Sequence, residues 1–90
     1  MISGYEIESL IYEDQLCRIV QIKSNQAKTE IMSEDLDELV TIVQGWAELK
    51  INDQIIKLNT KDSYFIQRKT CHQVSMTSED CIWICCYYKT

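Results

Sequence analysis

Proline is absent from this chain of 90 residues, and glycine occurs only at positions 4 and 45. Both residues are scarce for a protein with many turns, where glycine supplies the positive φ angles that tight reversals often require. The longest apolar run covers only residues 81–88, far short of the roughly 20 residues of a membrane helix. Residues 1–6 lack a basic segment followed by an apolar one, so we expect no secretory signal, no membrane partner and a cytoplasmic location.

Clustered positive charge is also missing. The net charge is −5, with nine Lys and Arg residues against 14 Asp and Glu residues. The adjacent basic pair Arg68-Lys69 lies in an expected turn, and the other basic residues are scattered. Binding to nucleic acid requires a basic patch that neutralises phosphates, and an anionic membrane surface requires the same. We therefore expect neither as a partner.

The cysteines show no spacing typical of a metal site or a redox motif. No C-x-x-C pair is present, which argues against a zinc ribbon or a thioredoxin-type motif. Their odd count of five argues against a disulfide framework. Cys71 precedes His72, the only histidine, but adjacent strand residues point to opposite faces, so we expect no catalytic Cys–His dyad. We interpret all five as small buried residues in a reducing compartment: Cys17, Cys71, Cys81, Cys85 and Cys86.

Hydrophobic periodicity predicts strands rather than helices. Turn signals such as Gln44-Gly45 and Asn52-Asp53 recur at short intervals, without a long amphipathic helix, which is typical of an all-β barrel or sandwich. Segment 81–88 is apolar on both faces and is expected to be a central strand or an interface strand. One domain spans residues 1–90, and we expect residues 1–5 to be loose. The expected strands are 16–22, 28–32, 38–43, 46–51, 54–58, 63–66, 72–76 and 81–88.

Two spaced signals resemble the motifs of cupins. Glu38 is followed by six residues and Gly45, as in the second half of the first cupin motif, G-x5-H-x-H-x3,4-E-x6-G. The second motif, G-x5-P-x-G-x2-H-x3-N, keeps its histidine as His72. Residues 72–77 and 81–84 are similar to the end of one group of small single-domain cupins. The remaining positions of the second motif hold other residues: Lys61, Gln67, Lys69 and Met76.

The resemblance covers nearly the whole chain and implies a small cupin with a degenerate metal site. The implied fold is all-β, a jelly-roll barrel or double-stranded β-helix in a single domain. The family motif has glycine at the positions of Lys61 and Lys69. If the backbone is left-handed there, each lysine costs about 1 kcal/mol relative to glycine.

The resemblance also bears on metal binding, because metal-dependent cupins use the two histidines of H-x-H, the glutamate and the late histidine. Here Glu38 and His72 match the last two. The H-x-H positions fall on one of two pairs, depending on the loop length chosen: Met32 and Glu34, or Ile31 and Ser33. With one imidazole available, we expect no metal and no other cofactor. The alternative is an oxygen-rich site of Glu34, Glu38 and His72, which would suit manganese or iron better than structural zinc.

A ligand pocket is expected from two strand faces. Glu38, Val40 and Ile42 share one face, and a second face carries His72, Val74 and Met76. If both look into the barrel, they form an apolar cavity with one carboxylate and one imidazole near its mouth, the general composition of a small-ligand site. The tryptophans and tyrosines are expected mainly to fill the barrel. No catalytic residue is assigned.

Two functional hypotheses remain open. The first is a non-enzymatic cupin that binds or senses a small molecule without a metal. The second is a metal-dependent isomerase or dioxygenase that uses Glu38 and His72. Under either, we expect a homodimer, because a small domain gains from burying surface against a second copy, and we place Trp83 or Tyr87 at or near the contact. Small cupins are commonly dimeric, which the resemblance also implies.

Overall fold

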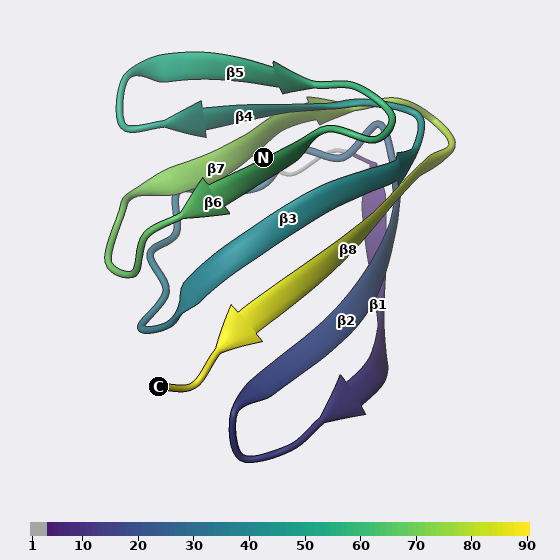
Figure 1. Cartoon of the computed structure of the whole chain (residues 1–90). Helices are drawn as coiled ribbons and strands as arrows, with labels where there is room; N and C mark the ends of the chain where they lie inside the picture. The colour runs from purple at the N-terminus through teal and green to yellow at the C-terminus, as the bar shows by residue number, and fades with distance from the viewer. Residues whose placement is uncertain (1–3) are drawn as a thin grey trace.

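The computed structural model describes residues 4–90, and these residues form an all-β domain. Antiparallel strands make a five-stranded sheet in the order β1-β2-β8-β3-β6 and a three-stranded sheet in the order β5-β4-β7 (Figure 1). The strands are β1 (Tyr5–Glu13), β2 (Cys17–Asn25), β3 (Asp37–Gln44), β4 (Ala47–Ile51), β5 (Gln54–Leu58), β6 (Ser63–Ile66), β7 (His72–Thr77) and β8 (Cys81–Tyr88). Across residues 4–90 we find no helix of the length and apolar character required to span a bilayer.

The predicted strands are formed with one exception. Segment 28–32 belongs to a loop between β2 and β3, in which only Met32 forms an isolated bridge, with His72. This loop instead runs along β7, held by backbone hydrogen bonds such as Thr29 N–H to the carbonyl of Val74 at 3.0 Å. We expected residues 1–5 to be loose, but residues 1–3 lie outside the described residues. Of the other two, Tyr5 is already the first residue of β1.

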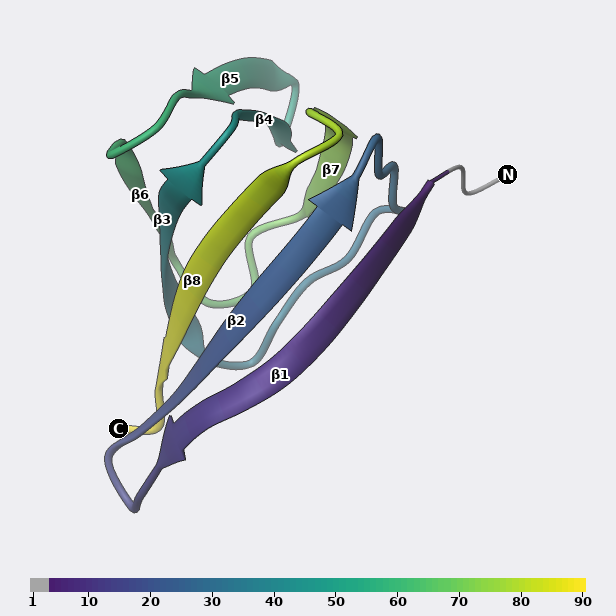
Figure 2. The same ribbon diagram turned by 90° about the vertical axis from the view of Figure 1, so that its right-hand side faces the viewer.

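The apolar core lies between the two sheets and follows the period-two alternation of their strands. Along β8, the side chains of Cys81, Trp83 and Cys85 are buried, whereas Ile82 and Ile84 between them are only half-buried. β8 is hydrogen-bonded to β2 on one side and to β3 on the other, so the prediction of a central strand is confirmed. Figure 2 shows β8, β2 and β1 side by side, with β1 at the free edge of the large sheet.

Both lysines at the glycine positions of the cupin motif have a left-handed backbone. Lys61 has a φ of 78° and Lys69 a φ of 64°, so the cost of about 1 kcal/mol relative to glycine applies at each position. Each conformation is fixed by a short backbone hydrogen bond from the lysine N–H, to the carbonyl of Ile42 and to that of Glu34, both at 2.7 Å. The turn after β3 needs its glycine for two reasons, since Gly45 has a φ of 76° and a Cβ there would overlap the Ser78 hydroxyl.

Lys69→Gly is expected to raise the free energy of unfolding by roughly 0.5–1 kcal/mol, because relief of the left-handed strain exceeds the entropy that glycine adds to the unfolded chain. Urea unfolding measures this change. Lys28→Gly, in the exposed loop without a positive φ, is the matched control and should destabilise. A Lys69→Gly protein no more stable than the Lys28→Gly protein would show that the left-handed backbone carries no strain.

Candidate functional site

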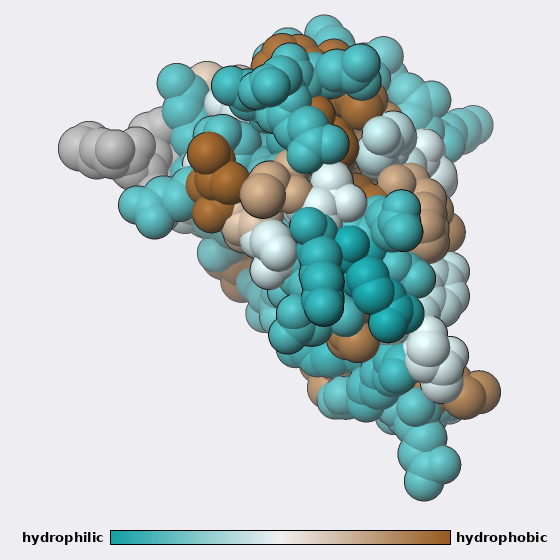
Figure 3. All heavy atoms as spheres, turned by 90° about the vertical axis from the view of Figure 1, so that its left-hand side faces the viewer, coloured by the Kyte–Doolittle hydropathy of each residue, from teal (hydrophilic) through white to brown (hydrophobic). Residues whose placement is uncertain are grey.

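A cavity of about 170 Å³ lies between the two sheets. It is near the end of the domain where β3 and β7 begin and where β6 and β8 finish. Figure 3 shows the side of the molecule with the β6–β7 turn, where polar residues predominate and apolar ones are scattered among them. The lining residues are Glu6, Glu8, Ile22, Met32, Glu34, Glu38, Val40, Leu49, Ile66, His72, Val74, Trp83, Cys85 and Tyr87.

Glu38 and His72 form the polar centre of the cavity. Each side chain belongs to a different sheet, and each residue is only 6% exposed. The Glu38 Oε1 atom lies 4.0 Å from His72 Nε2, too far for a direct hydrogen bond. On the other side of the ring, Nδ1 lies 2.9 Å from the carbonyl oxygen of Thr70. Because a carbonyl only accepts, Nδ1 carries a proton, and in the neutral ring Nε2 then offers its lone pair to the cavity.

Burial raises the pKa of the Glu38 carboxyl above its ordinary value. A hydrogen bond from Cys85 partly opposes this shift, as a His72 ring does when it is protonated, whereas the nearby Glu34 carboxylate adds to it. Burial, with the charge of Glu38, also raises the pKa of the Cys85 thiol and of the Tyr87 hydroxyl far above their usual ranges. Both groups are therefore protonated donors at neutral pH. The arrangement can hold a polar group by hydrogen bonds.

The loop before β3 decides between the two alignments of the H-x-H positions. Met32 and Glu34 line the cavity, whereas Ile31 is 69% exposed and Ser33 is exposed. A thioether and a carboxylate thus stand where metal-dependent cupins have imidazoles. Among residues 4–90, no group of three or more His, Cys, Asp or Glu side chains is placed to hold a metal ion. The residues present do not fit the family's metal centre, which needs about three well-placed protein ligands.

Four of the six predicted pocket residues line the cavity. They are Glu38, Val40, His72 and Val74. Ile42 is fully buried in the core and lies beyond the lining.

Met76 also lies away from the cavity. Between the pairs Leu49–Val74 and Glu48–Met76 the register of β4 and β7 shifts by a β-bulge. The bulge reverses the alternation of β7, so that Thr77 is buried and Met76 lies beside Glu48 on the outward face.

Two cavity residues on β1 were not predicted. Glu6 accepts a hydrogen bond at 3.0 Å from Ser24 Oγ, which itself accepts one at 3.0 Å from the indole nitrogen of Trp83. Glu8 pairs with Arg18 at 3.1 Å. The alternation of Glu6 and Glu8 along the strand is the signal that places both on one face, but only the pairing with β2 shows that this face looks into the cavity.

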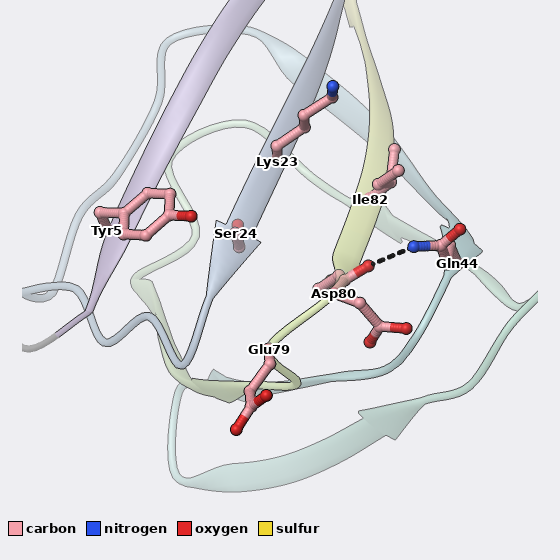
Figure 4. Close-up of a pocket in the computed structure, with 8 residues that line it drawn as sticks. Tyr5, Lys23, Ser24, Gln44, Glu79, Asp80 and Ile82 are labelled. Carbon is pink, nitrogen blue, oxygen red and sulfur yellow. Dashed lines mark hydrogen bonds between the residues drawn. The ribbon is translucent and has the colours of Figure 1, made fainter.

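A second hollow, of about 200 Å³, lies at the opposite end of the large sheet. Figure 4 shows its side chains spread around a surface depression, with the charged ends of Lys23 and Glu79 far apart and pointing away from one another. Gln44 Nε2 donates a hydrogen bond to the backbone carbonyl of Asp80 at 2.9 Å, which fixes a turn. No polar groups converge there, so the candidate site is the cavity with Glu38 and His72.

Two antiparallel sheets around one cavity, with a glutamate on β3 and a histidine on β7 meeting inside it, define a small cupin fold. A proposed mannose-6-phosphate isomerase of Ralstonia eutropha JMP134 has the same fold, with a TM-score of 0.89 and 20% identity over 96% of this chain and 86% of that one. KdgF of a Halomonas species is similar at a TM-score of 0.87 and 16% identity, over 94% of this chain and 79% of its own.

An RmlC-like cupin of Shewanella frigidimarina NCIMB 400 matches all of this chain and 84% of its own, at a TM-score of 0.85 and 16% identity. No protein-family model and no curated protein sequence matches the chain. At these identities the likeness establishes the fold alone, and at that level the resemblance to cupins is confirmed.

Glu38→Gln is expected to raise the melting temperature at pH 7. Because the pKa of Glu38 is raised from its ordinary value of 4.5, its ionised form destabilises the folded state above that pKa, and the penalty disappears below pH 4.5, where the carboxyl is protonated in both states. The gain should therefore vanish in melting curves recorded near pH 3.5. Glu48→Gln, on the outward face of β4, is the control. A gain that is the same at both pH values would show that Glu38 is not destabilised by burial.

Proposed function

We propose that this protein is a small-molecule-binding cupin, with a binding or regulatory role and without a conventional metal centre. The observation that carries the proposal is the Glu38–His72 pair, almost fully buried, with its facing atoms 4.0 Å apart across a cavity. A buried polar pair without a direct hydrogen bond is costly unless something satisfies it. The cavity is smaller than the roughly 300–1,000 Å³ of drug-sized sites, so the ligand is small.

The alternative is a metal-dependent enzyme of the isomerase or dioxygenase type that uses Glu38 and His72. The similar fold of a proposed mannose-6-phosphate isomerase favours this candidate. The lining opposes it in two ways. It supplies one imidazole where the family has three, and its carboxylates from Glu6, Glu34 and Glu38 would repel the phosphate of such a substrate.

We also propose a homodimer that buries the outer face of the five-stranded sheet. One row on this face takes an apolar residue from every strand: Tyr12, Ile19, Cys86, Leu39 and Phe65, each paired with the next. All nine residues of β1 are exposed, although the strand carries Ile7 and Leu10. A long apolar edge strand promotes association with another chain. A second copy is the occupant that would cover both features at once.

The residues predicted for the dimer contact need correction. Trp83 is 3% exposed and packs inside its own chain, and Tyr87 points into the cavity. The outward side chains of β8 are Ile82, Ile84, Cys86 and Tyr88. A cytoplasmic location remains a prediction, in keeping with cysteines that are all free. The expectation that all five cysteines are buried is wrong, because Cys71 is exposed and Cys17 and Cys86 are only partly buried.

Protein purified without chelators is expected to carry no stoichiometric transition metal. Because His72 is the only histidine, its ¹⁵N-labelled ring is an isolated NMR reporter, and its signals should shift when small polar fragments are added to chelator-treated protein. Stoichiometric iron, manganese, nickel or zinc that is lost in His72→Ala would contradict this proposal and favour the enzyme. Fragments that shift surface amides but leave the ring signals unchanged would also count against it.

Sedimentation at micromolar concentration should give the mass of a dimer. Ile84→Lys, on the outer face of β8, is expected to shift it to the monomer mass, because a charge in an apolar interface would be desolvated without a partner. Ile55→Lys is the matched control on the other sheet, where Ile55 is also exposed, and should remain dimeric. A monomeric wild-type protein, or an Ile84→Lys protein of unchanged mass, would contradict the proposed interface.

A further inference from the structure

The cavity carries an excess of negative charge. Four of its lining residues are glutamates, and none is a lysine or an arginine: Glu6, Glu8, Glu34 and Glu38. They come from three separate parts of the chain, namely β1, the loop before β3, and β3 itself. Folding therefore gathers like charges that the unfolded chain keeps further apart. Such an arrangement is destabilising unless a positive charge is nearby.

The described residues neutralise only part of this charge. Arg18 pairs with Glu8 at 3.1 Å, and the Ser24 hydroxyl donates to Glu6. Within residues 4–90, no lysine or arginine forms an ion pair with Glu34 or Glu38. The carboxylates without a lysine or arginine partner are thus those nearest to His72, whose Nε2 atom lies 4.0 Å from Glu38 Oε1.

His72 gives an independent indication of a ligand. The residue is more than nine-tenths buried, and its Nδ1 atom is engaged with the Thr70 carbonyl. Its Nε2 atom has no hydrogen-bond partner among the described residues, and the residue lines the cavity. In the neutral ring this atom is an acceptor, and the nearest charged atom, Glu38 Oε1 at 4.0 Å, is another acceptor. A donor placed between these two facing acceptors would form a hydrogen bond with each of them.

We infer that the ligand of this cavity is a small organic cation with N–H donors, such as a protonated primary amine. The inference rests on the proposed ligand-binding function and specifies its chemistry. An ammonium group has three donors and no acceptor, so one nitrogen can donate to both His72 Nε2 and Glu38 Oε1. Its charge also offsets that of Glu34. At about 30 Å³ per water molecule, the cavity of about 170 Å³ has room for about six water-sized groups, which limits the ligand to a short chain or a small ring.

Three probes of one shape and different charge test this inference: pentylamine, pentan-1-ol and pentanoate. Binding is measured at pH 7 by calorimetry and through the ring signals of His72. Pentylamine is expected to bind at least tenfold more tightly than pentan-1-ol, and pentanoate should not bind. Glu34→Gln and Glu38→Gln should each weaken pentylamine binding at least threefold, and Glu34→Gln should leave pentan-1-ol binding unchanged. Glu30→Gln, an exposed glutamate outside the lining, should bind all three probes as the wild type does.

A reversal of charge gives a second, independent readout. Glu34→Lys places a cation beside the cavity at a half-exposed position and is expected to abolish pentylamine binding while allowing pentanoate to bind. Circular dichroism with a wild-type strand signal shows that each variant is folded.

The outcomes separate this inference from the proposed function. Equal binding of pentan-1-ol and pentylamine would overturn the inference and leave the ligand-binding proposal standing. Failure of all three probes to shift the His72 signals would overturn both. Stoichiometric binding of Mn²⁺ that excludes pentylamine would also overturn the organic cation, in favour of the metal-dependent alternative.

Discussion

The pairing of β8 with both β2 and β3 is the interaction on which the other features depend. The registers of these pairings place inward-facing side chains of neighbouring strands opposite one another. One such row crosses β2, β8, β3 and β6 through Val20, Cys85, Val40 and Tyr64. Without β8, the β1–β2 hairpin would have no connection to the rest of the large sheet. The strand is apolar on both faces. Its inner face fills the core, and its outer face contributes to the apolar row that crosses the sheet.

Polar groups within this apolar frame follow the same registers. Ser24, buried on β2, links the Trp83 indole to Glu6 on the edge strand. Glu38 lies opposite Tyr87 across the β3–β8 pairing, which brings a protonated hydroxyl beside the carboxyl. Among the described residues, every fully buried side-chain nitrogen or oxygen has a hydrogen-bond partner.

Much of the fold could be predicted because its signals are local. Alternation located the strands other than β1, and motif spacing identified Glu38 and His72 as residues that meet, although 33 residues lie between them in the sequence. The cupin motif has glycine at the positions of Lys61 and Lys69, and the backbone is left-handed at both. The prediction of a strand over residues 28–32 was wrong, because a loop that lies against a strand can show the same weak alternation of apolar and polar residues.

The remaining features depend on tertiary context. A β-bulge in β7 turned Met76 outward, and an inserted residue of this kind leaves no clear mark in the sequence. Glu6 and Glu8 reached the cavity only through the pairing of β1 with β2. The sequence of β8 is apolar on both faces and does not show which face packs against the core. Trp83 was therefore placed at an interface, whereas it is buried inside its own chain.

The placement of Met32 and Glu34 bears on how the cavity could be redesigned. Both side chains face the cavity from the positions that hold the paired imidazoles of metal-dependent cupins, beside Glu38 and His72. Replacing both residues with histidine would therefore bring the ligand types of such a metal centre together in one cavity.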